Sequence, residues 1–94
     1  MARVEKLMSI SRSEFEAGWR TFDASAAPAA GAPARLPAGA GEVEIAFEPR
    51  SGVRLGGLLE LPRAVVIFTF HGVDPEPRAR LIARFDRAFQ RGGG

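Results

Sequence analysis

The chain has no cysteine and no tyrosine, and it has one histidine and one lysine among its 94 residues. The absence of cysteine excludes disulfides, thiol catalysis, iron–sulfur clusters and cysteine-ligated zinc. With a single histidine and no cluster of carboxylates, we expect no metal site and no cofactor. No stretch approaches the roughly 18 apolar residues that span a bilayer, and the first residues lack the apolar core of a signal peptide. These absences favour a cytoplasmic protein that does not contact membranes.

The remaining composition is that of an ordinary globular chain, with 46% hydrophobic and 26% charged residues. A length of 94 residues allows one small domain, which buries too little surface for a large stability margin. Such a chain can gain further stability by associating with a second copy or with a partner. The net charge of +2 does not require a nucleic-acid partner. Almost all positive charge is arginine, and together with abundant alanine and glycine this indicates a high-GC bacterial coding bias.

The N-terminal part predicts an extension followed by an amphipathic helix. Residues 1–10 are read as the extension, of which the first seven are dispensable if Met8 is the true start. Ser11 and Glu14 have the spacing of a capping box at the start of a helix over 11–23. The apolar residues that recur at i, i+4 and i+7 are Phe15, Trp19 and Phe22. This aromatic stripe either completes the core of its own domain or binds a groove on a partner.

A disordered linker is expected over residues 24–41. This segment holds nine alanines, three glycines and three prolines among 18 residues. Its prolines are spaced so that no helix of useful length survives. We therefore expect an Ala/Pro/Gly tether that joins the first helix to the rest of the domain.

Residues 42–94 predict a β-β-β-α core. Alternating or continuous apolar patterns indicate strands over 42–48, 53–61 and 64–71. Turn residues separate them at 49–52 and at Pro62, and the pair Gly56-Gly57 suggests a bulge. A helix opens at Pro75 after the cap residue Asp74, and Gly92–Gly94 ends it. The expected fold is α+β, a three-stranded antiparallel meander with the C-terminal helix on one face.

The third predicted strand is apolar on both faces and lies at a sheet edge in a simple meander. An exposed apolar edge strand requires a cover. The candidate contact residues are Val65, Ile67, Phe68 and Phe70. We expect the same strand of a second copy to cover them in a homodimer; the alternative cover is the first helix.

Arginines on the C-terminal helix form a second candidate surface. They follow a spacing of +4, +3 and +4, which places them on one narrow stripe, and they are Arg80, Arg84, Arg87 and Arg91. Aligned guanidinium groups can bind phosphates or an acidic partner. The alternative is a solvated charged face. Nucleic acid is the less favoured ligand, because no exposed aromatic residue interleaves the arginines for base stacking.

His71 is the basis of a weaker, enzymatic hypothesis. It ends the third predicted strand, three residues before Asp74, which could orient its imidazole as a base. No nucleophile or substrate pocket accompanies it, so we assign no catalytic residue. The sequence favours a small non-enzymatic protein-interaction module that forms a homodimer. Binding of nucleic acid or an acidic partner by the arginine stripe is the alternative.

Overall fold

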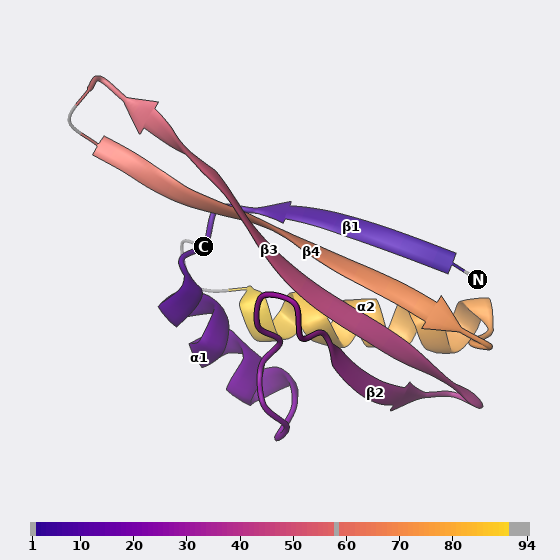
Figure 1. The fold of residues 1–94 in the computed structure, drawn as a ribbon. Helices are drawn as coiled ribbons and strands as arrows, with labels where there is room; N and C mark the ends of the chain where they lie inside the picture. The colour runs from indigo at the N-terminus through magenta and orange to yellow at the C-terminus, as the bar shows by residue number, and fades with distance from the viewer. Residues whose placement is uncertain (1, 58, 91–94) are drawn as a thin grey trace.

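In the computed structural model, which describes residues 2–57 and 59–90, the chain forms one antiparallel sheet and two helices (Figure 1). The elements in chain order are β1 (Ala2–Met8), α1 (Arg12–Phe22), β2 (Ala34–Ala38), β3 (Gly41–Leu55), β4 (Leu59–His71) and α2 (Pro75–Phe89). The sheet has four strands in the order β1-β4-β3-β2. The α+β class predicted from the sequence is confirmed. The prediction of three strands is wrong, because segments outside the predicted core pair at both edges of the sheet.

Strand β4 lies inside the sheet. Its continuous β-branched and aromatic run pairs with β3 on one side and with β1 on the other, where Val4 faces Phe68 in the register. The expectation of an open edge at this strand is therefore wrong. The cover is the N-terminal segment of the same chain, for which the sequence predicts only an extension.

Strands β3 and β4 form one long hairpin instead of three short strands. The segment Pro49–Gly52 does not turn the chain; the ladder shifts register there, between Arg50 and Val53, as a bulge does. The chain reverses at Gly56 and Gly57, whose φ angles of 63° and 75° suit glycine. Pro62 lies inside β4 and closes no turn. The far end of this hairpin projects beyond both helices (Figure 1).

Helix α1 begins as its sequence predicts. The Ser11 hydroxyl accepts a hydrogen bond from the Glu14 backbone N–H at 3.2 Å, and the Glu14 carboxylate accepts one from the Ser11 N–H at 2.9 Å. The predicted capping box is confirmed. Helix α2 likewise begins at Pro75 after Asp74 and ends at Phe89. The predicted glycine stop over 92–94 lies outside the described residues.

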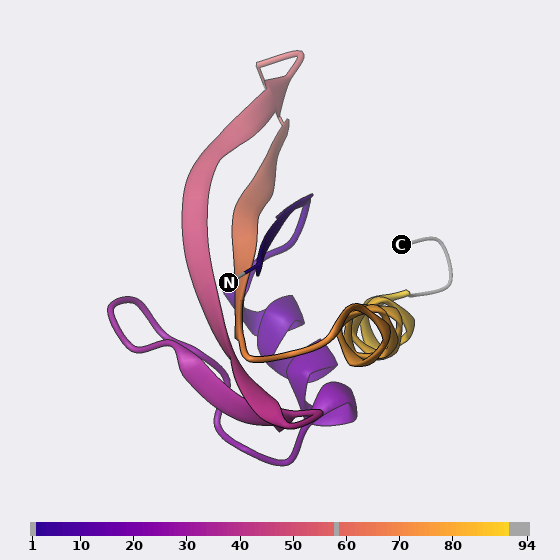
Figure 2. The same ribbon diagram turned by 90° about the vertical axis from the view of Figure 1, so that its right-hand side faces the viewer.

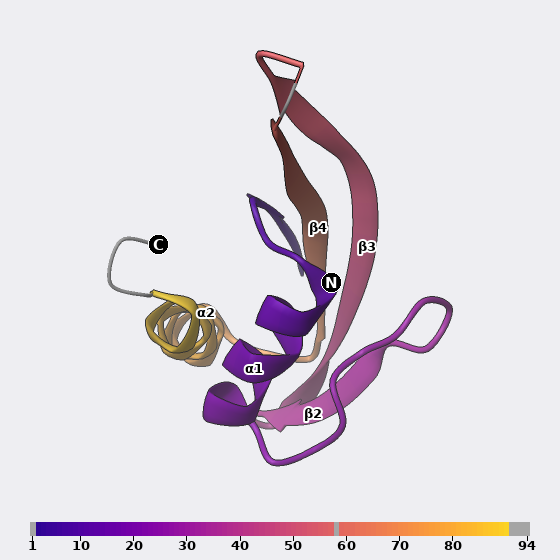
Figure 3. The same ribbon diagram turned by 90° about the vertical axis from the view of Figure 1, so that its left-hand side faces the viewer.

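Both helices pack on the same face of the sheet (Figures 2 and 3). The three aromatic residues of α1 are almost fully buried there. The ring centre of Phe15 lies 4.3 Å from that of Phe47 on β3 in a tilted arrangement, and Phe22 meets the Phe85 ring of α2 edge-on at 5.3 Å. The rest of the core comes from Leu81 of α2 and from the inward-facing residues of the strands, namely Leu36, Ala38, Val43, Ile45, Phe47, Ala64, Val66, Phe68 and Phe70. The aromatic stripe of α1 thus completes the core of its own domain.

The segment between α1 and β3 contains a strand and is tied to the domain, unlike the predicted disordered tether. The Trp19 indole N–H donates to the Ser25 carbonyl at 2.9 Å, and the Arg12 guanidinium donates to the Pro28 carbonyl. Pro28 itself is fully buried. Strand β2 follows and buries Leu36 against the core. The segment between α1 and β3 therefore has the composition of a linker, but hydrogen bonds to its backbone carbonyls and apolar contacts at alternate residues hold it in place.

The opposite face of the sheet carries no helix in the described part of the chain (Figures 2 and 3). Ion pairs cross this face, among them Arg35 with Glu44 at 3.6 Å. Between the charged residues lie Val65 and Ile67, each less than a tenth exposed, and Leu7, which is 59% exposed. This face is thus mostly polar, with a narrow aliphatic strip on β4.

Candidate binding groove beside helix α2

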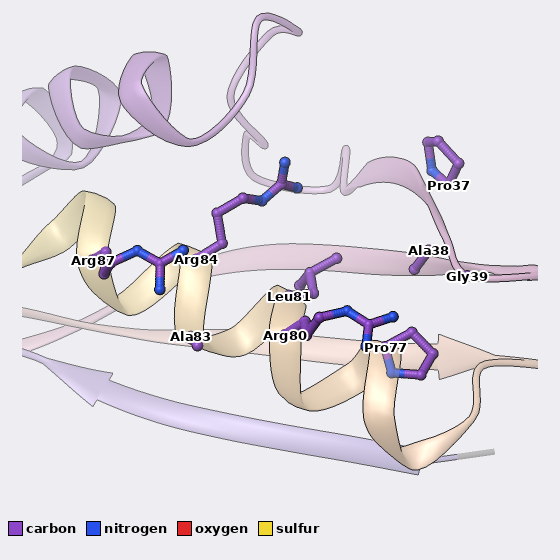
Figure 4. A pocket seen from close by; sticks show the side chains of 9 residues that line it. All are labelled: Pro37, Ala38, Gly39, Pro77, Arg80, Leu81, Ala83, Arg84 and Arg87. Atoms are coloured by element: carbon purple, nitrogen blue, oxygen red, sulfur yellow. The ribbon is translucent and has the colours of Figure 1, made fainter.

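Helix α2 separates its apolar and basic residues into two faces. Leu81 and Phe85 are buried against the sheet and α1. Arg80, Arg84 and Arg87 project from successive turns on an exposed side of the helix (Figure 4). This placement follows from the +4 and +3 spacing. The fourth predicted member of the stripe, Arg91, lies outside the described residues.

The three arginines border a hollow of about 500 Å³ between α2 and the β2–β3 turn (Figure 4). Its lining residues are Pro37, Ala38, Gly39, Pro77, Arg80, Leu81, Ala83, Arg84 and Arg87. The turn approaches the first turn of α2 closely: a Cβ atom on Gly39 would lie 3.0 Å from the Pro77 side chain. Gly39 also has a positive φ of 55°, so glycine is favoured at this contact on both grounds. The resulting groove has an apolar floor and a basic rim.

The guanidinium groups differ in what they contact. Arg80 forms an exposed ion pair with Glu76, one helical turn away, which contributes little to stability. The guanidinium carbon of Arg84 lies 4.7 Å from the centre of the Phe22 ring, a cation–π contact that fixes its position. Arg87 has no ion pair with any residue in the described ranges 2–57 and 59–90. The stripe therefore offers one positioned cation, one loosely paired cation and one that is free.

One carboxylate, that of Asp23, lies near Arg84. The pKa of Asp23 is lowered, first by a hydrogen bond from the Ser25 side chain and next by one from the Ser25 backbone N–H; burial opposes the shift, and the positive charge of Arg84 adds to it. Asp23 is therefore ionised at neutral pH and offsets part of the positive charge of Arg84. Within residues 2–57 and 59–90, the positive charge of the stripe is least offset at Arg87, because Arg80 pairs with Glu76.

A groove of this kind suits a ligand that carries carboxylates next to aliphatic groups. Guanidinium groups hold carboxylates or phosphates through paired N–H donors. Leu81, Ala38 and the two proline rings supply apolar contact surface below them. The lining residues are proline, alanine, glycine, leucine and arginine, and none of these side chains is a nucleophile.

The structure places the other predicted contact residues away from this groove. Phe15, Trp19 and Phe22 are 0–3% exposed, so their surfaces are already occupied. In β4, Phe68 and Phe70 are buried under the helices, whereas Val65 and Ile67 lie on the open face of the sheet. None of these seven side chains stands at a free strand edge.

His71 lies at the end of β4 on the open face of the sheet. Its Nε2 atom is 3.4 Å from Glu44 Oε1, and its side chain is 42% exposed. The neighbour that sequence spacing suggested, Asp74, is instead the N-cap residue of α2. The His71 imidazole thus lies beside the Glu44 carboxylate, which also pairs with Arg35 at 3.6 Å.

Three residues of the groove, Pro37, Ala38 and Gly39, were missed in the sequence because they fall within the expected linker. The alternation of Ala34, Leu36 and Ala38 with polar or proline positions was the available evidence for a strand there. Pro37 is compatible with that strand because β2 is an edge strand, where a missing N–H costs no ladder bond.

The described residues form a small α+β fold. In residues 2–57 and 59–90, no group of three or more histidine, aspartate or glutamate side chains has a geometry that could hold a metal ion. In the same part of the chain, no helix combines the length and apolar character needed to cross a membrane. Comparisons with protein-family models, with curated proteins and with solved structures find no match to this chain.

Proposed function

We propose that this chain is a non-enzymatic interaction module that binds an acidic segment of a partner protein in the groove beside α2. The observation that carries the proposal is the arginine stripe of α2 standing over an apolar floor, with Arg87 unpaired in the described part of the chain. If the arginine stripe were only a solvated charged face, no groove beside it would be required. The cysteine-free, arginine-rich composition supports a cytoplasmic location in a bacterium.

An acidic protein segment fits the groove better than a nucleic acid does. Single-stranded nucleic acids are held by aromatic side chains on which the bases stack. Among the residues whose side chains the structure describes, the exposed large apolar ones are Leu7 and Leu61, and neither is aromatic. The floor of the groove offers proline and aliphatic contacts, which suit peptide side chains.

The test uses fluorescence anisotropy with a labelled peptide built from glutamate and leucine. We expect the whole chain to bind this peptide and to bind its glutamine counterpart, which lacks the charges, far more weakly. The variant R80E/R87E should bind the acidic peptide about 10- to 30-fold more weakly, since two attractive contacts become repulsive. Arg84 is left intact because its contact with Phe22 supports the core. Raising the salt from about 50 to about 500 mM should weaken binding.

The matched control is R20E/R54E, which makes the same change of net charge at two exposed arginines outside α2. This variant should bind as the unmodified chain does. Equal losses in the two variants would show that only net charge matters and would overturn the proposal. Tight binding of a single-stranded DNA oligonucleotide, with no binding of the acidic peptide, would replace the proposal with the nucleic-acid alternative.

A further inference from the structure

The free edge of the sheet at β1 has the features of a pairing surface. Strand β1 pairs with β4 over seven consecutive residues without a bulge, and its other side faces away from the remaining elements (Figure 1). It contains no proline, whereas the opposite edge strand, β2, contains Pro37 and has five residues. Lys6 is the charged residue of β1 on the inner face of the sheet, a placement that discourages edge pairing. Its Nζ atom lies 3.1 Å from Asp86 of α2, which neutralises it.

The charges of β1 favour one register among those that pair the middle of the strand with a second copy. In a continuous antiparallel sheet, a two-fold axis perpendicular to the sheet must pass midway between one residue and its own copy, because directly facing residues point to the same face. Axes through Arg3, Glu5 or Lys6 each place that charged residue opposite its own copy, which is unfavourable. An axis through Val4 instead places Arg3 opposite Glu5 of the partner subunit, and Glu5 opposite the partner's Arg3.

A second hollow lies where such an axis would pass. It has a volume of about 590 Å³ and separates β1 from α2. Its lining residues are Ala2, Val4, Pro75, Arg78, Ala79, Ile82, Ala83 and Asp86. Val4 and Ile82 are only partly buried against the core in the single chain. Because Val4 lines this hollow and would face the partner's Val4, pairing would bring the hollows of the two copies close to the axis.

The geometry points to a homodimer in which the β1 strands of two copies pair antiparallel about Val4 and join their sheets. The occupant of the edge is a second copy of this chain, because the charge pattern of β1 is complementary to itself. The helices lie on one face of the sheet and do not cross the edge (Figure 2). This surface is separate from the arginine groove, so the inference does not depend on the proposed function.

The test is the solution mass by light scattering at about 100 µM, a concentration at which a micromolar dimer is populated. We expect twice the mass of the 10.1 kDa chain. Each single variant, R3E or E5R, places like charges opposite one another at two symmetric positions. Each should raise the dimer dissociation constant about 10-fold or more. An equimolar mixture of R3E and E5R should recover the dimer, since Glu then faces Arg at both positions.

The recovery in the mixture separates a pairing role from a loss of folding, because both variants lose the Arg3–Glu5 pair within one chain, which measures 2.9 Å. The control R54E alters an exposed charge on the β3–β4 hairpin and should stay dimeric. When R54E replaces R3E in the mixture with E5R, the E5R chains should not regain a dimer. A monomeric unmodified chain, single variants that dimerise normally, or a mixture that stays monomeric would each overturn the inference.

Discussion

At the scale of single residues, Gly18 determines how closely the two helices approach. It is buried in α1, and a Cβ atom there would collide with the ring of Phe89 at the end of α2. The aromatic rings of Phe15 and Phe89 stack beside it at 5.3 Å. The absence of a side chain at this position therefore allows the two helices to share one aromatic cluster.

We expect G18A to destabilise the protein by about 1 kcal/mol in urea unfolding. The overpacking against Phe89 costs about 1–3 kcal/mol, which exceeds the gain of about 0.5–1 kcal/mol from replacing a helical glycine by alanine. In an F89A background the collision is gone, and the same substitution should stabilise the protein by about 0.5 kcal/mol. If G18A lowered stability equally in both backgrounds, the close packing of Gly18 on Phe89 would be disproved.

At the scale of elements, the helices could be predicted from the sequence and the sheet only in part. Capping residues and the i, i+4, i+7 pattern are local, and they define both helices. Strand pairing is not local. The inner face of β1 contains Lys6 and its outer face Leu7, which breaks the alternation that indicates a strand. Lys6 lies on the inner face with its side chain 29% exposed, and its Nζ atom pairs with Asp86, 80 residues later.

The turns between the strands were misjudged for a related reason. Proline, serine and glycine at 49–52 are typical turn residues, yet a bulge accommodates them inside a long strand. Gly56-Gly57 is a strong turn sequence, but the apolar residues on either side also fit a single bulged strand. Which of the two glycine-containing segments reverses the chain depends on the pairing of β4 with β1 and β3.

The arginine stripe, by contrast, could be predicted from helical spacing alone. Only the apolar side of its groove could not be predicted without the structure.

Hydrogen exchange tests whether the segment after α1 is ordered. We expect the backbone amides of Ala34, Leu36 and Ala38 to exchange on average at least about 10-fold more slowly than in an unstructured peptide, because β2 pairs with β3. The exposed tip at Gly31 serves as an internal reference and should exchange rapidly. Exchange at the unstructured rate across the whole segment would support a disordered tether and remove one wall of the groove.

At the scale of the whole molecule, α2 lies between two hollows of different character. One side of the helix presents arginines toward the β2–β3 turn, and the other presents Ile82 and Asp86 toward β1. Ala83 lines both hollows. A ligand held by the arginines and a second copy bound through β1 would therefore occupy opposite sides of one helix without competing.

The most direct test of the account is an NMR titration of the ¹⁵N-labelled chain with the glutamate–leucine peptide. Binding in the groove predicts that amide shifts concentrate in two segments, 38–39 and 78–87, with β1 and the open face of the sheet unchanged. The R80E/R87E variant should lose these shifts. Shifts that map instead to β1 or to the open face, or that persist in the variant, would contradict the claim that the arginine stripe of α2 is the binding site.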